Sequence, residues 1–156
     1  MVVCFANIRI FQLIGDSNAI ILFSENCDKI ALKSHHGKYV VAERNGQANA
    51  NRRRRGFGEL FTVEYIDTHQ IGLKGANRKY LVAESNGQAN WNRDYLWSGE
   101  IFTVEKVSDT EIALKSYYGE YLVAESNGDL NANREQLGPW GKFSVECVSD
   151  LTVYST

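Results

Sequence analysis

One stretch of 41 residues occurs three times in this sequence, and that repeat constrains the fold more than any other feature. The first copy begins at Ile30 and reads I-A-L-K-S-H-H-G-K-Y-V-V-A-E-R-N-G-Q-A-N-A-N-R, followed by a connecting loop and L-F-T-V-E. The pattern returns at Ile71 and at Ile112, and the differences 71 − 30 and 112 − 71 are both 41. A period of this length predicts an array of one supersecondary unit.

Each repeat carries the signals of four short strands. Ile30 and Leu32 alternate with Lys33, Tyr39–Glu43 is rich in β-forming residues, and Leu60–Glu64 alternates again. Asn45-Gly46 predicts a tight hairpin, and the same dipeptide recurs 41 and 82 residues later. No stretch has a sustained 3.6-residue apolar period, so we expect little helix.

The hairpin signal also predicts a register. With Asn45-Gly46 as the loop, Val41 pairs with Ala50 and Tyr39 pairs with Arg52. Strict alternation then divides the side chains between two faces. The face that we expect to point inward holds Tyr39, Val41, Ala48 and Ala50, and the opposite face holds Val40, Ala42, Asn49 and Asn51.

Three units of four strands predict an all-β domain with pseudo-threefold symmetry. Propellers typically close with about four to eight blades, and an open stack of three units would leave strand edges exposed. A closed barrel capped by three hairpins avoids both problems. The sequence therefore predicts a β-trefoil with three pseudo-symmetric four-strand repeats of 41 residues.

The predicted domain spans residues 1–156, with repeats at about 30–70, 71–111 and 112–152. Residues 1–29 are expected to form an N-terminal arm plus one strand, Ala19–Phe23, that completes the barrel. Leu151–Tyr154 resembles the start of a fourth unit, and Val2–Ile14 has no counterpart in the repeat.

Composition bounds the class of protein. A net charge of −2 over 156 residues excludes a generally basic, nucleic-acid-coating chain. No stretch has the run of about 20 apolar residues that a membrane span needs, and Met1–Ile14 does not read as a signal peptide. Cys4, Cys27 and Cys147 are odd in number and lack metal-ligand spacing, so we expect free thiols and a cytoplasmic protein.

The repeat resembles that of fascin-type β-trefoils. The pieces that carry the resemblance are G-K-Y-V-V-A-E-R-N-G, A-N-R and F-T-V-E, with their copies, over residues of about 29–150. Fascins bundle actin filaments, and related small trefoils bind actin and membrane surfaces. The resemblance therefore implies an actin-binding or actin-crosslinking module. A chain with one such domain would need a homodimer or a second binding surface to crosslink filaments.

A set of polar residues is conserved among the three copies. Either these side chains complete the hairpin cap, or they form three equivalent sugar-binding sites beside the repeated tyrosines. Three weak sites would gain avidity on a multivalent glycan. The members are Glu43, Asn49, Asn51 and Arg52; Glu84, Asn90, Asn92 and Arg93; and Glu125, Asn131, Asn133 and Arg134.

Residues that differ between the copies are not explained by the symmetry of the fold. The run Arg52–Arg55 has only Arg52 in common with the other copies, so it is either a solvated loop or a patch for an anionic partner. Trp91, Trp97 and Trp140 are also specific to one copy. We expect at least one of them to fill the end of the barrel, and Trp91 and Trp97 are candidate partner contacts.

The sequence offers no catalytic motif, no metal-ligand cluster and no cofactor signature. We therefore expect a binding protein rather than an enzyme, without a metal or a cofactor. The first hypothesis is an actin-binding module, the second is a carbohydrate-binding lectin with up to three sites, and the third is an interaction domain without a ligand of its own.

Overall fold

The computed structural model describes residues 11–13, 20–22 and 29–148. This part of the chain consists of strands, loops and three single-turn 3-10 helices, without an α-helix. The first repeat contains β3 (Lys29–Lys33), β4 (Tyr39–Ala42), β5 (Ala48–Arg52), η1 (Phe57–Glu59) and β6 (Phe61–Tyr65). The second contains β7 (Gln70–Lys74), β8 (Tyr80–Ala83), β9 (Ala89–Arg93), η2 (Ser98–Glu100) and β10 (Phe102–Lys106). The third contains β11 (Glu111–Lys115), β12 (Tyr121–Ala124), β13 (Leu130–Arg134), η3 (Pro139–Gly141) and β14 (Phe143–Val148).

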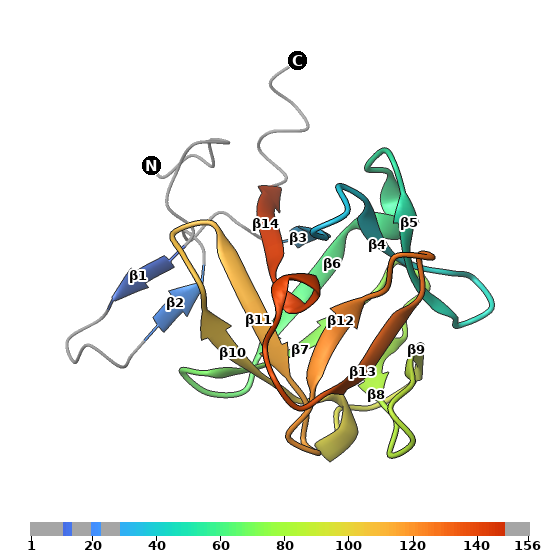
Figure 1. The fold of residues 1–156 in the computed structure, drawn as a ribbon. Helices are drawn as coiled ribbons and strands as arrows, with labels where there is room; N and C mark the ends of the chain where they lie inside the picture. Colours follow the sequence, from blue (N-terminus) through green and yellow to red (C-terminus); the bar gives the residue numbers. More distant parts are fainter. Residues whose placement is uncertain (1–10, 14–19, 23–28, 149–156) are drawn as a thin grey trace.

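The first and last strands of each repeat form a closed barrel of six strands (Figure 1). Neighbours around the barrel are β3, β6, β7, β10, β11 and β14, all antiparallel. The ladder from Ser144 opposite Lys33 to Val148 opposite Lys29 joins β14 to β3 and closes the ring. Closure leaves no free edge among these strands, as the repeat predicted.

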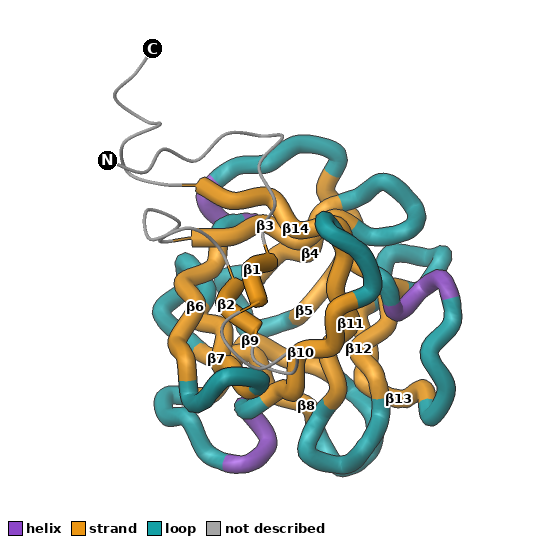
Figure 2. The backbone as a smooth tube through the Cα atoms, turned by 90° about the vertical axis from the view of Figure 1, so that its left-hand side faces the viewer, coloured by secondary structure: helices purple, strands orange, loops and turns teal. Residues whose placement is uncertain are grey.

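The two middle strands of each repeat form a hairpin outside the barrel, with its loop as the sequence indicated (Figure 2). In the first copy the Glu43 N–H donates to the Gln47 carbonyl at 3.0 Å, and the Gly46 N–H donates to the Glu43 carbonyl at 3.0 Å. Gly46 has φ +92°, a value that a side chain would make costly. The Asn-Gly signal therefore predicted the hairpin correctly, but the loop has three residues and a glycine bulge instead of the two residues expected.

Next to the loop, the predicted register of this hairpin was wrong by one residue. Val41 pairs with Asn49, because the loop has three residues instead of two, and a bulge between Tyr39 and Val41 restores the expected pairing of Tyr39 with Arg52. The longer loop reverses the two faces of β4. Val40 and Ala42, expected on the outer face, therefore join Ala48 and Ala50 in the core cluster.

The three hairpins interlock in a ring at one end of the barrel. The Trp91 N–H donates to the Gly46 carbonyl at 2.7 Å, so the first hairpin loop contacts the second repeat. The Ala132 N–H donates to the Gly87 carbonyl at 2.8 Å, which joins the second repeat to the third. The Ala50 N–H donates to the Gly128 carbonyl at 2.7 Å and completes the ring. Each repeat is thus held by the next.

The segment before the repeats differs from the expectation. Strand β2 (Ile20–Leu22) pairs with β1 (Phe11–Leu13) in a separate two-stranded sheet. In the described part of the chain β2 has no place in the barrel, where β14 pairs directly with β3. The expectation that Ala19–Phe23 supplies a barrel strand is therefore corrected. The predictions for Leu151–Tyr154 and for the rest of Val2–Ile14 lie outside the described residues.

Cys147 is disulfide-bonded, so the expectation of a free thiol is wrong at this position. The other two cysteines, Cys4 and Cys27, lie outside the described residues. A disulfide at Cys147 removes the reason for expecting a reducing compartment. Within the ranges given above, no helix has the length and apolar character to cross a bilayer, and no three His, Cys, Asp or Glu side chains gather as metal ligands.

Candidate functional site

The polar residues that recur in every repeat are bonded to one another. Arg52 Nη2 donates to both carboxylate oxygens of Glu43, at 2.7 and 2.8 Å, and Asn49 Nδ2 donates to the same carboxylate at 3.2 Å. Arg52 Nη1 donates to Asn51 Oδ1. The same cluster forms in the other repeats, around the pairs Arg93–Glu84 and Arg134–Glu125.

This cluster ties the two strands of each hairpin together, so its repetition has a structural cause. The arginine and carboxylate side chains in the first copy are 41% and 22% exposed, and an ion pair this open to solvent contributes about 0–1 kcal/mol. A sugar hydroxyl would have to displace bonds that are already made. The geometry agrees with the cap interpretation of these residues.

A second repeated cluster links each tyrosine to a glutamate of the barrel. The Tyr39 hydroxyl donates to Glu146 at 2.6 Å, and the Tyr121 hydroxyl donates to Glu105 at 2.8 Å. In the second repeat, a hydrogen bond to Glu64, together with burial, raises the pKa of Tyr80 to about 12. A lysine ammonium lies 5.3 to 5.4 Å from each tyrosine ring centroid.

The arginine run divides into paired and unpaired side chains. Arg52 belongs to the hairpin cluster, and Arg55 Nη1 donates to Glu146 at 2.8 Å. Arg53 and Arg54 are exposed, and within the described part of the chain neither has an ion-pair partner. Phe57, three residues beyond Arg54, is 85% exposed. The loop thus exposes two cations and, three residues further on, an aromatic ring.

Trp91 is fully buried, which corrects the expectation that it contacts a partner. Its indole stacks on Phe61 with ring centroids 4.5 Å apart and an angle of 22°. It fills the hairpin end of the core, as we expected for at least one of the three tryptophans. Trp91 is therefore a packing residue.

Trp97 is 74% exposed and remains a candidate contact residue. Its ring stacks with that of Tyr95, which is 69% exposed, at a centroid distance of 6.2 Å. The loop that carries this pair, next to η2, lies far from the arginine loop next to η1 (Figures 1 and 2). The structure therefore does not bring Arg53 and Trp97 into one site.

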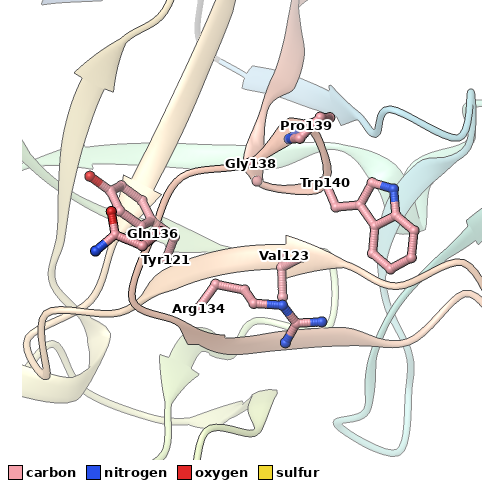
Figure 3. A pocket seen from close by; sticks show the side chains of 8 residues that line it. Tyr121, Val123, Arg134, Gln136, Gly138, Pro139 and Trp140 are labelled. Carbon is pink, nitrogen blue, oxygen red and sulfur yellow. The ribbon is translucent and has the colours of Figure 1, made fainter.

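The third repeat contains a pocket that was not predicted from the sequence. It lies between the β12–β13 hairpin and the η3 loop, has a volume of about 200 Å³, and is shown in Figure 3. Its lining residues are Tyr121, Val123, Arg134, Gln136, Gly138, Pro139, Trp140 and Gly141. A signal was present, because the position held by Glu59 and Glu100 in the first two copies is Gly141 in the third.

Comparison with known families agrees with this architecture. The model of the Fascin domain matches residues 35–145, which is more than half of the 156-residue chain. The chain belongs to the fascin domain family. A comparison with curated proteins gives no match.

Membership in the fascin domain family identifies the kind of activity to expect. Fascin domains are non-enzymatic binding and crosslinking domains. In this fascin domain, the residues identical in all copies form the core, the turns and the hairpin clusters. Among the exposed residues that differ between copies, five on the η1 and η2 loops are the candidates for partner contact: Arg53, Arg54, Phe57, Tyr95 and Trp97.

Proposed function

We propose that this chain is a β-trefoil of the fascin type that binds actin filaments without enzymatic activity and crosslinks them through two separate surfaces. The basic surface consists of Arg53, Arg54 and Phe57. The aromatic surface consists of Tyr95 and Trp97. The observation that carries the proposal is that both surfaces consist of exposed residues on two separate loops of a fascin domain, one next to η1 and one next to η2.

The chemistry of the two surfaces suits two different contacts. Arg53 and Arg54 make no ion pairs within the described residues, so their charges are available to the acidic surface of a filament. Trp97 and Tyr95 offer two large stacked rings, the residue type that dominates binding energy at protein interfaces. A single domain with two such surfaces can contact two filaments, so crosslinking needs no dimer.

Co-sedimentation with filamentous actin tests the proposal. The double variant Arg53→Ala/Arg54→Ala should pellet with actin about tenfold more weakly than the parent, because it loses two unpaired cations. Arg44→Ala is the matched control, since Arg44 is an exposed arginine on the β4–β5 hairpin loop. Binding should also weaken as salt rises to about 0.5 M. Equal pelleting of the parent and the double variant would remove the basic surface from the proposal.

Low-speed sedimentation separates bundling from binding. Trp97→Ala should still pellet with filaments at high speed, through the basic surface, but should no longer form bundles that pellet at low speed. If Trp97→Ala still forms bundles, and bundling is lost only when a dimer is forced to dissociate, the crosslinks would instead come from a homodimer.

Carbohydrate binding is the second candidate, and the exposed Tyr95–Trp97 stack favours it because sugar rings pack on such aromatic faces. This site would be single, since the repeated polar residues are bonded to one another. A glycan array distinguishes the candidates: a hit that resists 0.5 M salt and disappears in Trp97→Ala supports a lectin.

An actin partner implies a cytoplasmic protein. Disulfides such as that of Cys147 are rare in the cytoplasm. Titration of thiols in denatured protein that was purified under non-reducing conditions therefore tests the compartment. Three reactive thiols would mean that all the cysteines are reduced, as in the cytoplasm. One reactive thiol would mean that a disulfide has formed, as in an oxidising compartment.

A further inference from the structure

Two repeats place a carboxylate of their own between the hairpin and the 3-10 turn. In the first, Glu59 Oε1 accepts the Gly56 N–H at 3.0 Å. In the second, Glu100 Oε2 accepts the Trp97 N–H at 2.9 Å, and the other oxygen lies 3.6 Å from Arg93 Nε. Both glutamates are buried, with 8% and 4% exposure. The fold thus has a carboxylate position built into this gap.

The third repeat keeps the arginine and the backbone N–H of this position without the carboxylate, and Pro139-Trp140 replaces Phe57-Gly58 and Ser98-Gly99. Gly141 stands where the others have glutamate, and the pocket of about 200 Å³ lies there. Among the residues that the structure describes, no acceptor takes the Gly138 N–H, the counterpart of the N–H groups at 56 and 97. Arg134, the counterpart of Arg93, lines the pocket from below in Figure 3.

We propose that this pocket binds the carboxylate of a ligand in the position that Glu59 and Glu100 occupy in the other repeats. The terminal nitrogens of Arg134 are already engaged by Glu125 and Asn133, which leaves Nε–H for the ligand, as in the contact of Arg93 with Glu100. The Gly138 N–H supplies the second donor. Charge-assisted hydrogen bonds of this kind are the stronger ones in proteins.

The remainder of the pocket determines what can carry the carboxylate. Val123, Pro139 and Trp140 present apolar surface beside the two donors (Figure 3). A volume of about 200 Å³ is below the range of about 300–1,000 Å³ that holds drug-sized ligands. The ligand class is therefore a small aromatic or aliphatic acid, or one acidic side chain of a partner. This inference does not depend on the proposed actin contact.

An NMR titration of the full ¹⁵N-labelled chain at pH 7 tests the proposal. Benzoate should shift the Gly138 amide, the Arg134 Nε–H and the Trp140 indole signals with a Kd in the millimolar range or below. Benzyl alcohol, which has the same ring without the charge, should not. Equal shifts with both compounds would overturn the carboxylate assignment. A parallel titration with N-acetyl-glutamate amide distinguishes a partner's side chain, which this blocked residue mimics, from a free acid.

Variants of residue 141 provide the matched control. Gly141→Glu should fill the site from within and abolish the benzoate shifts, whereas Gly141→Ala should retain them. Both introduce a Cβ that would lie 2.9 Å from Leu137 Cδ1, so both require the same movement of that side chain. Retained binding in folded Gly141→Glu would overturn the proposal.

If Gly141→Glu does not fold, the opposite substitution in the second repeat, Glu100→Gly, tests whether this position binds a carboxylate. Glu100→Gly should create a second benzoate site, seen as a new shift at the Trp97 amide and a stoichiometry near two. A folded Glu100→Gly chain without that second site would show that the surroundings do not recognise a carboxylate.

Discussion

A single tryptophan breaks the threefold symmetry of the core, and so does a glycine next to it. Trp91 occupies the position of Ala50 and Ala132 in the other repeats, and Gly75 occupies that of Ser34 and Ser116. A Cβ added at Gly75 would lie 2.7 Å from Ala42 Cβ, 2.9 Å from Asn77 Oδ1 and 3.2 Å from Trp91 Cε3. The indole is thus one of three groups that leave little room for a side chain at residue 75.

This pairing predicts a coupling between the two positions. Trp91→Ala should lower the free energy of unfolding by about 3–5 kcal/mol, because it removes a fully buried indole and leaves a cavity. Gly75→Ser should cost about 1–3 kcal/mol in the parent chain and less in the Trp91→Ala background. Urea unfolding of the four chains measures both effects. Strictly additive free energies would contradict the coupling.

At the scale of the elements, the hairpin loops determine how the repeats join. Gly46, Gly87 and Gly128 all have positive φ, and each faces an asparagine of the next repeat. A Cβ added at Gly87 would lie 2.8 Å from Asn133 Cβ. The glycine therefore serves the turn and also the close approach of two repeats.

A comparison of two glycines separates the effect of the turn from the effect of the close approach. Gly119 has φ +81° and nothing within 4 Å of an added Cβ, whereas Gly87 has φ +89° and the contact with Asn133. Gly119→Ala should cost about 1 kcal/mol or slightly more from backbone strain alone. Gly87→Ala should cost a further 1–3 kcal/mol, approximately, from overpacking. Denaturant midpoints measure the difference, and equal losses would mean that the loop contact contributes nothing.

The elements also show where sequence reasoning succeeds and where it stops. The Asn-Gly dipeptides and the 41-residue period predicted the hairpins and the barrel, because turns and closure impose the same residues on each copy. The three-residue loop and the bulge after Tyr39 could not be recognised in the sequence, since all four residues of β4 are buried and carry no alternation. The replacement of Glu59 by Gly141 at the equivalent position can be read in the sequence. That this replacement opens a pocket could be learned only from the structure, which shows that residue 141 lines it.

At the scale of the molecule, no repeat has a complete set of contacts by itself. The barrel ladders β6–β7, β10–β11 and β14–β3 join different repeats, and so do the three hairpin-loop bonds. The core cluster is contiguous across all three. Such a ring differs from an open solenoid, in which each unit depends only on its neighbours in sequence.

The ring predicts a single cooperative unfolding transition. In a urea series followed by NMR, the amide signals of Ala42, Ala83 and Ala124, one from each repeat, should disappear with the same midpoint. Gly87→Ala should shift all three midpoints together, although the substitution lies in one repeat. Separate midpoints in either chain would show that the repeats unfold independently.

Because the ladder between β14 and β3 closes the barrel, the backbone pairing would be the same whichever repeat came first in the chain. Val148 lies opposite Lys29 in that ladder, as Ile66 faces Gln70 and Val107 faces Glu111, where each N–H donates to the carbonyl at 2.9 Å. Two of these junctions are covalent hairpins and one is not, yet their backbone pairing is alike. A circular permutant that links Val148 to Lys29 and is opened at the Ile66–Gln70 turn would keep every barrel ladder.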